Sequence, residues 1–466
     1  MVQNSKHLDR RNNSNDRQLS VYGLTPKVET AIIDAVQKGA ARRVRALIAP
    51  LHPADQADLL ERLPAGAAAS IIRFLDDRLN AETLTYLNEI TREEVVDVMG
   101  IKSLARQLNN LSTDDAIDII EGMERDTLAD VLAALSTQKR LLIEESLSFP
   151  ENSAGRLMQR EMITVPSFWT VGQTIDFLRN GEIKTAEFYL IFVVDPARKP
   201  LGEVPLSKLL CAQRHCRIPE IMEGDFRVIP LNMDQEEVAI LFRRYGMVSA
   251  GVVDLRNRLV GMITIDDVIG VIDEEAEEDL MALAGVGEAS LRSSLVETMK
   301  GRAAWLLVNL VTAILASVVI GVFDGTIEQL VALAVLMPIV ASMGGNAGTQ
   351  TVAVAVRAIA LRQLDSQSTS NFIFREVLVA LLNGLAFAGL AGLVSFLWFG
   401  DPEIALVMAI AMLANLLVAG LSGTLVPVGL LRSGVDPAVA SSVFVTTITD
   451  VVGFSVFLGL AALYLI

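Results

Sequence analysis

The sequence has 466 residues, of which 52% are hydrophobic and 20% are charged, and its mean hydropathy is +0.45. The chain is too apolar for an ordinary soluble protein and too charged for one that lies wholly in a membrane. Its apolar and charged residues must therefore lie in different parts of the chain. Residues 301–466 hold eight acids and five arginines, which leaves −13 of the net charge of −16 on residues 1–300. A region so acidic repels nucleic acid and anionic lipid and attracts cations.

The N-terminal third of the chain predicts helices. Residues 1–20 are polar and lack the apolar core of a secretory signal, so we expect a disordered arm there. From 21 to 149, apolar residues recur at three- and four-residue spacing, which predicts an all-helical domain. Residues 51–63 align without gaps with residues 111–123. This repeat indicates stacked helical hairpins in a superhelix.

From residue 150 onward, short β-branched runs alternate with helical segments. One pattern occurs twice, in residues 188–210 and 248–270: a buried strand that ends in Val-Val-Asp, a turn, and a second strand that leads into a helix. The two copies resemble a tandem pair of CBS domains, small α/β modules that usually pair face to face and often bind adenine nucleotides. We expect the first domain at 150–214 and the second at 215–272.

The second of these modules is the better candidate for an adenine nucleotide such as ATP. Thr264 and Asp267 fit the nucleotide-ribose pattern of such domains, whereas the first copy has Pro205 and Lys208 at the matching positions. The resemblance therefore favours a nucleotide in the second copy rather than in the first.

The two cysteines, Cys211 and Cys216, lie close together on either side of His215. They cannot build a disulfide framework. With His215 they offer three ligands, whereas structural zinc sites use four. We interpret them as reduced thiols of a cytosolic domain.

The C-terminal part of the chain predicts membrane helices. Residues 273–300 form an acidic connector that favours a helix, with six acids between Asp273 and Asp279. Five apolar spans of at least 21 residues follow, and each is long enough to cross a bilayer. The spans are 303–323, 330–356, 377–400, 404–431 and 437–466.

Charges at the ends of the spans predict their orientation. Lys300 and Arg302 precede the first span, Asp324 and Glu328 follow it, and basic and acidic ends alternate at every later crossing. By the positive-inside rule the N-terminal domains are cytoplasmic and the C-terminus is outside.

Asp450 is the charged residue inside the last span, with thirteen uncharged residues before it and sixteen after it. A carboxylate at mid-membrane costs roughly 2.5 to 3.5 kcal/mol, and it must face protein or water rather than lipid. No basic residue lies within the five spans, so none of them offers a salt-bridge partner. A permeating cation is therefore the counter-ion that we expect.

The second span contains MPIVASMGGNAGTQTVAVAV, in which Pro338 and three glycines disfavour an uninterrupted helix in water. Small residues of this kind indicate close helix packing in a membrane. They equally fit a locally loosened segment that lines an aqueous path, with oxygens from Asn346 and Gln350. Both interpretations stay open at this level.

The ligands offered around Asp450 are all oxygens. They include the hydroxyls of Thr446, Thr447 and Thr449, together with amides and backbone carbonyls. Such ligands suit Mg²⁺, Ca²⁺ or Mn²⁺ rather than copper or zinc. Because one carboxylate is a weak cation site, we expect a homodimer whose pore lies on the two-fold axis and receives two facing carboxylates.

Three motifs resemble the membrane domain of the bacterial MgtE magnesium channels: MPIVASMGGNAGTQ from Met337, GVDPA from Gly434 and TTITDV from Thr446. The order of helical domain, tandem CBS domains, acidic connector and five membrane helices matches as well. The resemblance covers nearly the whole chain beyond its first 20 residues. It implies a homodimeric, Mg²⁺-selective channel in the plasma (inner) membrane that senses cytosolic Mg²⁺ and closes when Mg²⁺ is plentiful.

The resemblance also implies roles for individual residues. It makes Asp450 the selectivity carboxylate, with the backbone around Thr446 and Asn346 nearby, and the family has alanine where this chain has Thr446. Two acidic sensing positions of the family are Ser70 and Gly246 here. The regulatory acids that it implies are Asp114, Asp118, Asp234, Glu236, Asp267, Glu275, Glu278, Asp279 and Asp436.

Two other functions compete with a channel. One is a secondary cation carrier coupled through Asp450, and the other is a membrane-tethered metal or nucleotide sensor that conducts nothing. The sequence has no Walker motif, no G-x-S-x-G motif and only three histidines, so we expect neither an ATP-driven pump nor an enzyme. The expected partners are a second copy of the chain, membrane lipid and divalent cations, and not nucleic acid.

Overall fold

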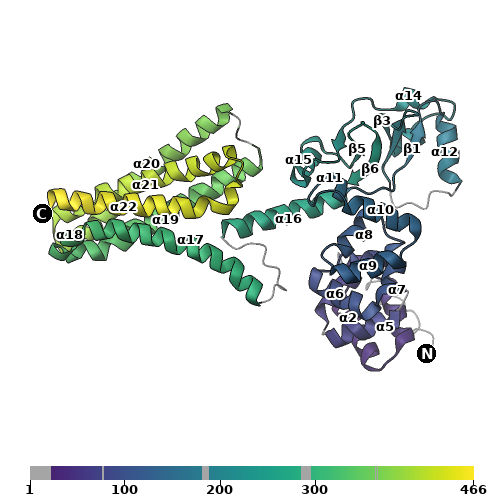
Figure 1. Ribbon diagram of the computed structural model, residues 1–466, viewed down its shortest axis with the longest axis horizontal. Coiled ribbons are helices and arrows are strands. Elements are labelled where there is room, and N and C mark those ends of the chain that lie inside the picture. The colour runs from purple at the N-terminus through teal and green to yellow at the C-terminus, as the bar shows by residue number, and fades with distance from the viewer. Residues whose placement is uncertain are drawn as a thin grey trace, which may run out of the picture. The chain divides into compact units, whose positions relative to one another are not determined.

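The computed structural model describes residues 23–63, 65–75, 78–180, 188–284, 295–362, 364 and 366–466, and Figure 1 labels its elements. The predicted N-terminal arm lies outside these residues. The chain forms two compact units, Met1–Ile272 and Asp273–Ile466.

The second unit contains five helices that are long and apolar enough to cross a membrane, which confirms the five predicted spans. Leucine, valine and phenylalanine side chains stand exposed along them, as expected for surfaces that face lipid. A short helix, α18, connects the first two. The elements are α17 (Leu295–Val322), α18 (Asp324–Gln329), α19 (Val331–Ala360), α20 (Ser366–Phe399), α21 (Pro402–Arg432) and α22 (Pro437–Tyr464).

Small residues let these helices pack closely. A methyl group on Gly348 of α19 would lie 2.5 Å from Val445 Cγ1 of α22, and one on Gly420 of α21 would lie 2.5 Å from Ala380 Cβ of α20. Helix α19 runs without interruption through Pro338. Of the two interpretations of this stretch, the unbroken helix favours close packing over a loosened backbone, because neighbouring helices compensate for residues that would weaken a helix in water.

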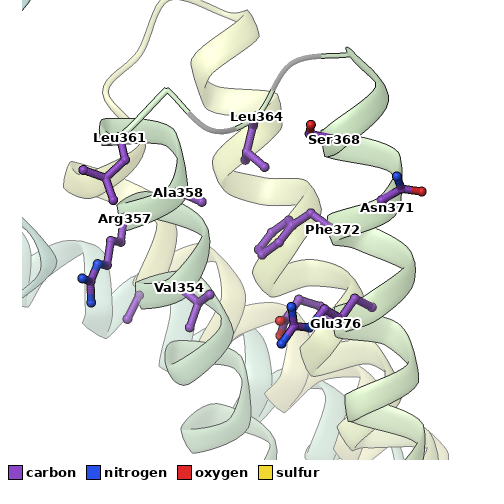
Figure 2. A pocket seen from close by; sticks show the side chains of 11 residues that line it. Val354, Arg357, Ala358, Leu361, Leu364, Ser368, Asn371, Phe372 and Glu376 are labelled. Atoms are coloured by element: carbon purple, nitrogen blue, oxygen red, sulfur yellow. The ribbon is translucent and has the colours of Figure 1, made fainter. Parts of the chain in front are cut away.

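A cavity of about 800 Å³ opens between α19 and α20, near the C-terminal end of α19 and the first turns of α20 (Figure 2). Its lining combines apolar side chains with arginines, including Arg357 and Arg375.

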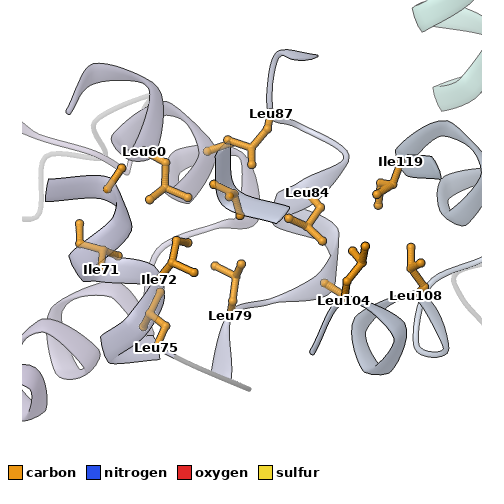
Figure 3. Close-up of a cluster of buried hydrophobic side chains, with 14 of the residues drawn as sticks. Leu60, Ile71, Ile72, Leu75, Leu79, Leu84, Leu87, Leu104, Leu108 and Ile119 are labelled. Carbon is orange, nitrogen blue, oxygen red and sulfur yellow. The ribbon is translucent and has the colours of Figure 1, made fainter. Parts of the chain in front are cut away.

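In the first unit, the described residues between 26 and 147 fold into helices around a core of leucine, isoleucine and valine, as the three- and four-residue spacing predicts (Figure 3). Polar caps start several helices: the side chain of Asn88, for example, accepts a hydrogen bond from the Thr91 N–H. The helices are α2 (Pro26–Gln37), α3 (Ala41–Ile48), α4 (Pro53–Arg62), α5 (Ala65–Leu75), η2 (Ala81–Leu84), α6 (Glu89–Met99), α7 (Ile101–Leu108), α8 (Thr113–Ile120), α9 (Arg125–Ala134) and α10 (Thr137–Leu147).

Two three-stranded sheets follow, and they have the same topology. In each sheet the first strand pairs in parallel with the second, and the second pairs antiparallel with the third. The strands are β1 (Thr164–Pro166), β2 (Leu190–Val194), β3 (Pro200–Pro205), β4 (Val228–Pro230), β5 (Ser249–Val253) and β6 (Leu259–Thr264). The helices are α11 (Ala154–Leu157), α12 (Val171–Arg179), α13 (Leu206–Cys211), α14 (Ile218–Ile221), α15 (Gln235–Tyr245) and α16 (Ile265–Leu283).

The repeated Val-Val-Asp pattern has a structural cause. Asp195 accepts hydrogen bonds from the backbone N–H groups of Ala197 and Lys199, both at 2.8 Å. Asp254 holds the equivalent turn of the second copy in the same way, and accepts from the backbone N–H groups of Arg256 and Arg258 at 2.9 Å each. A carboxylate at the end of the strand therefore fixes each hairpin turn. This match confirms the tandem α/β repeat predicted from the sequence.

Candidate functional site

The polar stretches of α19 and α22 meet within one chain. A methyl group on Gly345 would lie 3.7 Å from Thr446 Cγ2, and one on Gly348 would lie 3.8 Å from Thr449 Cγ2. Asn346 follows Gly345 on α19, and it is exposed, as is Gln350. The structure thus brings the second and fifth predicted spans together, with two amides on an open face.

Asp450 lies on α22 and is half-buried. Among the described residues, no side chain forms an ion pair or a hydrogen bond with its carboxylate. A half-buried charge is costly without a partner, so a carboxylate in this position requires a counter-ion.

The three threonines before Asp450 donate their hydroxyl protons to their own helix. Thr446 Oγ1 bonds the carbonyl oxygen atoms of Ser442 and Val443 at 3.0 Å, and Thr449 Oγ1 bonds that of Thr446 at 2.9 Å. Thr446 is partly exposed, whereas Thr449 is fully buried. Thr449 therefore supports the backbone at Thr446, and its hydroxyl does not reach the surface of the single chain.

Asn415 on α21 is a polar residue that the sequence analysis missed. It is fully buried, its Nδ2 donates to the Val340 carbonyl oxygen of α19 at 2.8 Å, and its Oδ1 has no hydrogen-bond partner among the described residues. Methyl groups on Gly344 and Gly453 would lie 2.2 and 2.7 Å from Nδ2. An amide in the middle of an apolar span was the signal that could have identified it.

Acids of α8 and of the first turn of α16 approach one another in the first unit. Burial, followed by the charge of Asp267, raises the pKa of Asp114 well above its ordinary value. Burial is also the main cause that raises the pKa of Asp267 to about 7. Burial is also the main cause that raises the pKa of Asp115, and the charges of Asp118 and then Asp266 add to it. Asp114 and Asp267 were predicted from the sequence, whereas their chain neighbours Asp115 and Asp266 were not.

A second group of acids lies in the other unit, where the end of α16 meets the start of α22. Ala282 and Leu283 of α16 pack against a cluster that includes Val352 and Ala438. Burial, then the charge of Asp436, then that of Glu275, raises the pKa of Asp279. The predicted connector acid Asp279 is therefore near both the predicted acid Asp436 and its neighbour Glu275 on α16.

The other predicted regulatory acids have different local partners. Asp118 forms an ion pair with Arg92, with Oδ2 and Nη1 2.9 Å apart, so a basic residue already neutralises it. Asp234 caps α15 by accepting a hydrogen bond from the Glu236 N–H at 2.9 Å. Glu278 is exposed on α16. Within the described part of the chain, no three His, Cys, Asp or Glu residues lie together as a preformed metal site.

The two positions where the family's acids are missing have local roles. Ser70 Oγ donates to the Gly66 carbonyl oxygen at 2.8 Å within its own helix. Gly246 ends α15 with φ at +62°, a left-handed conformation that favours glycine. Neither residue offers a carboxylate to a cation.

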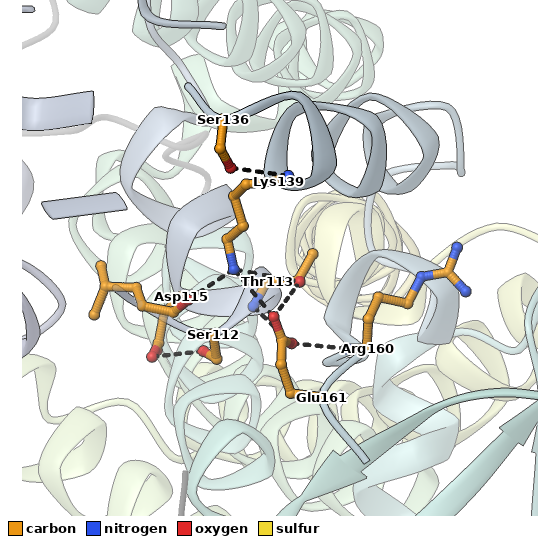
Figure 4. A network of polar contacts seen from close by, with 8 residues as sticks. Ser112, Thr113, Asp115, Ser136, Lys139, Arg160 and Glu161 are labelled. Atoms are coloured by element: carbon orange, nitrogen blue, oxygen red, sulfur yellow. Dashed lines mark hydrogen bonds and ion pairs between the residues drawn. The ribbon is translucent and has the colours of Figure 1, made fainter. Parts of the chain in front are cut away.

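A buried ion pair ties α8 and α10 to the segment that leads into the first sheet. Lys139 Nζ lies 3.1 Å from Glu161 Oε1, and Thr113 Oγ1 donates to the same oxygen at 2.8 Å (Figure 4). Although burial opposes ionisation, the charge of Lys139 and the bonds from Thr113 hold the pKa of Glu161 below its usual value. None of the sequence motifs pointed to this network.

Thr264 and Asp267, the predicted nucleotide contacts, form a hydrogen-bonded pair. Thr264 Oγ1 donates to Asp267 Oδ2 at 2.7 Å, and Gln159 Nε2 lies 3.3 Å from Thr264 Oγ1. The predicted free thiols, Cys211 and Cys216, form no disulfide.

Three family models match the chain. One described as "Divalent cation transporter" matches residues 337–460. One described as "MgtE intracellular N domain" matches residues 51–152, and a CBS domain model matches residues 218–274.

The chain is 30% identical over 445 residues to a protein of Thermus thermophilus named "Magnesium transporter MgtE", which covers 94% of this chain and 99% of that protein. A crystal structure of the soluble part of a magnesium transporter is 24% identical, covers 54% of this chain and 98% of that one, and has a TM-score of 0.50. A crystal structure of the cytosolic domain of the Mg²⁺ channel MgtE in complex with ATP is 29% identical, covers 52% of this chain and 99% of that one, and has a TM-score of 0.49.

Proposed function

This chain belongs to the MgtE family of magnesium transporters, and on that premise we propose that Mg²⁺ crosses the membrane along the face of α19 and α22 that carries Asn346, Gln350, Thr446 and Asp450. The observation that carries the proposal is the half-buried carboxylate of Asp450, which has no partner among the described residues. Mg²⁺ keeps several of its waters, so a few oxygens that contact a hydrated ion suffice.

Two copies of the chain build the path. One half-buried carboxylate is a weak site for a divalent ion, and a two-fold axis beside α19 and α22 doubles it from a single gene. The exposed amides of Asn346 and Gln350 support this arrangement, since polar side chains at membrane depth face protein or water rather than lipid.

The protein works as a channel rather than as a carrier. A divalent ion that enters down a potential of 100 mV gains roughly 4.6 kcal/mol, so no coupled ion is needed for uptake. A carrier that exchanges protons through Asp450 is the alternative. Discrete single-channel currents would support the channel, and their absence together with proton movement would support the carrier.

Cytosolic Mg²⁺ closes the path by binding between acids. Asp114 and Asp267 repel each other across α8 and α16, and Asp279 and Asp436 do so between α16 and α22. A cation that bridges either pair stabilises the arrangement that holds the acids together, because it binds that arrangement more tightly than a separated one. Glu275 and Glu278 add negative charge on α16, and Asp234 and Glu236 do so on α15. Asp118 contributes its carboxylate to Mg²⁺ binding when the ion displaces Arg92 from it.

The second CBS domain binds an adenine nucleotide such as ATP. Asp267 holds Thr264 Oγ1 at 2.7 Å, so a carboxylate and a hydroxyl are presented together, as contacts to the hydroxyls of a ribose require. The N-terminal domains lie in the cytoplasm and the C-terminus outside, which the alternating basic and acidic ends of the spans support.

Mg²⁺ flux into liposomes that hold the purified full chain tests the ion path. We expect Asp450→Asn to lower the flux by roughly tenfold or more, which corresponds to a loss of about 1.4 kcal/mol of interaction with the ion. Glu328→Gln removes an exposed acid of α18 and is the matched control, with unchanged flux. Equal flux in the Asp450→Asn variant and the parent would overturn the proposal and favour a non-conducting sensor. Raised internal Mg²⁺ should close the parent protein.

A further inference from the structure

The cavity of about 800 Å³ between α19 and α20 carries unbalanced positive charge. Arg357 and Arg375 line it, both are exposed, and neither side chain forms an ion pair or hydrogen bond within the described residues. Glu376 is the acid in its lining, which leaves a net charge of +1. Since residues 301–466 have a net charge of −3, two arginines in one cavity are a local exception.

The start of α20 adds a second attraction for an anion. This helix begins at Ser366, so Ser368, which lines the cavity, lies in its first turn. The helix dipole makes that end of α20 partly positive. The same cavity therefore combines two cationic side chains with the positive end of a long helix.

The remaining walls of the cavity are apolar. Val354 and Leu361 come from α19, and Leu364 and Phe372 come from the α20 side. Figure 2 shows the ring of Phe372 pointing from α20 toward α19. A fully hydrated anion gains nothing from such walls, whereas an anionic group attached to a hydrocarbon chain buries part of that chain against them.

We propose that this cavity binds an anionic phospholipid, with its phosphodiester between Arg357 and Arg375 and the start of its acyl chains against Phe372 and Val354. Basic cavities between membrane helices on the cytoplasmic side suit such headgroups. The orientation proposed above places this end of the bundle in the cytoplasmic leaflet, but the site itself does not depend on the proposed ion path.

Native mass spectrometry of the detergent-purified full chain tests the site, with phosphatidylglycerol and phosphatidylcholine of the same acyl chains as probes. We expect the parent protein to bind phosphatidylglycerol more tightly. Arg357→Gln and Arg375→Gln should each weaken that binding about fivefold, and the two together more strongly. Arg432→Gln removes the same charge from the last turn of α21, which does not line the cavity, and should change nothing.

A variant that is expected to strengthen lipid binding tests the site even if the arginine variants fail to fold. Glu376→Gln removes the acid from the cavity and should tighten binding of phosphatidylglycerol. Three results would each overturn the proposal. The parent could bind both lipids equally, Arg432→Gln could weaken phosphatidylglycerol binding as much as the cavity arginine variants do, or Glu376→Gln could leave that binding unchanged. Displacement of the lipid by millimolar inorganic phosphate would reassign the site to a soluble anion. Cross-linking of Phe372→Cys between subunits would assign the cavity to a second copy of the chain.

Discussion

At the scale of single residues, the membrane unit shows how an apolar bundle holds a polar group. Asn415 contributes one hydrogen bond to α19, and two glycines on neighbouring helices leave room for its amide. Its Oδ1 is buried without a partner among the described residues, which costs about 1 to 3 kcal/mol, so tight packing around it must offset that cost.

Gly344→Ala should therefore destabilise the protein. Its methyl group would lie 2.2 Å from Asn415 Nδ2, and overpacking of this kind costs about 1 to 3 kcal/mol. The melting temperature of the detergent-purified protein measures the effect. Gly389→Ala on α20 is the control, since nothing lies within 4 Å of its methyl group. A second substitution, Asn415→Ala, should restore part of the loss, and an unchanged melting temperature in Gly344→Ala would contradict the packing argument.

The raised pKa of Asp267 predicts a dependence of stability on pH. The pKa of Asp267 is about 7 in the folded state, against an ordinary value of 3.8. Between these two pH values the folded state therefore keeps a proton on Asp267 that the unfolded state has released. The stabilisation is complete below about pH 4 and is lost as the pH rises through about 7.

Asp267→Asn should accordingly melt at a higher temperature than the parent at pH 8 in the absence of Mg²⁺, and the difference should shrink toward pH 5. Asp130→Asn, at an exposed position of α9, serves as the control and should show no such trend. A difference between Asp267→Asn and the parent that stays constant with pH would show that the carboxyl does not titrate between the two states.

At the scale of elements, the contact between α10 and the segment before β1 depends on one buried pair. Lys139 Nζ donates to the carbonyl oxygen of Leu111 at 2.7 Å as well as to Glu161, so the lysine joins two helices to the sheet region. Its side chain is only 8% exposed. Removal of one partner leaves the other charge buried, which is the costly outcome for a buried pair.

Lys139→Met should destabilise the cytosolic unit by about 3 kcal/mol, because Glu161 would stay buried without its counter-ion. The double variant Lys139→Met/Glu161→Gln should recover most of this loss. Lys38→Met breaks an exposed pair with Asp34 and should cost less than about 1 kcal/mol. The first unfolding transition of the full chain reports the differences, and equal losses in the two lysine variants would contradict the role given to burial.

At the scale of the whole molecule, the exposed polar face of α19 predicts a two-fold assembly. In a chain with Cys211 and Cys216 replaced by serine, Asn346→Cys should form a disulfide-linked dimer on mild oxidation, because a two-fold axis brings the same residue from two copies together. Val318→Cys, on the exposed surface of α17, is the control that should stay monomeric on a denaturing gel. Cross-linking of Val318→Cys in place of Asn346→Cys would put the axis elsewhere.

The sequence by itself determined the features that depend on periodicity and length. Five apolar spans, a helical N-terminal domain and a repeated α/β pattern follow from where apolar residues recur, and the structure has all three. Asp450 could be recognised because one charge among apolar residues is conspicuous without any knowledge of its neighbours.

The tertiary structure decided what depends on contacts between distant residues. It kept α19 helical through Pro338, paired Asp118 with Arg92, buried Thr449, and brought Asp279 next to Asp436. Local patterns fix which face of an element is apolar, but they do not fix which neighbour meets that face. The hydrogen bonds, ion pairs and repulsions that set the role of a polar residue arise only once the chain has packed.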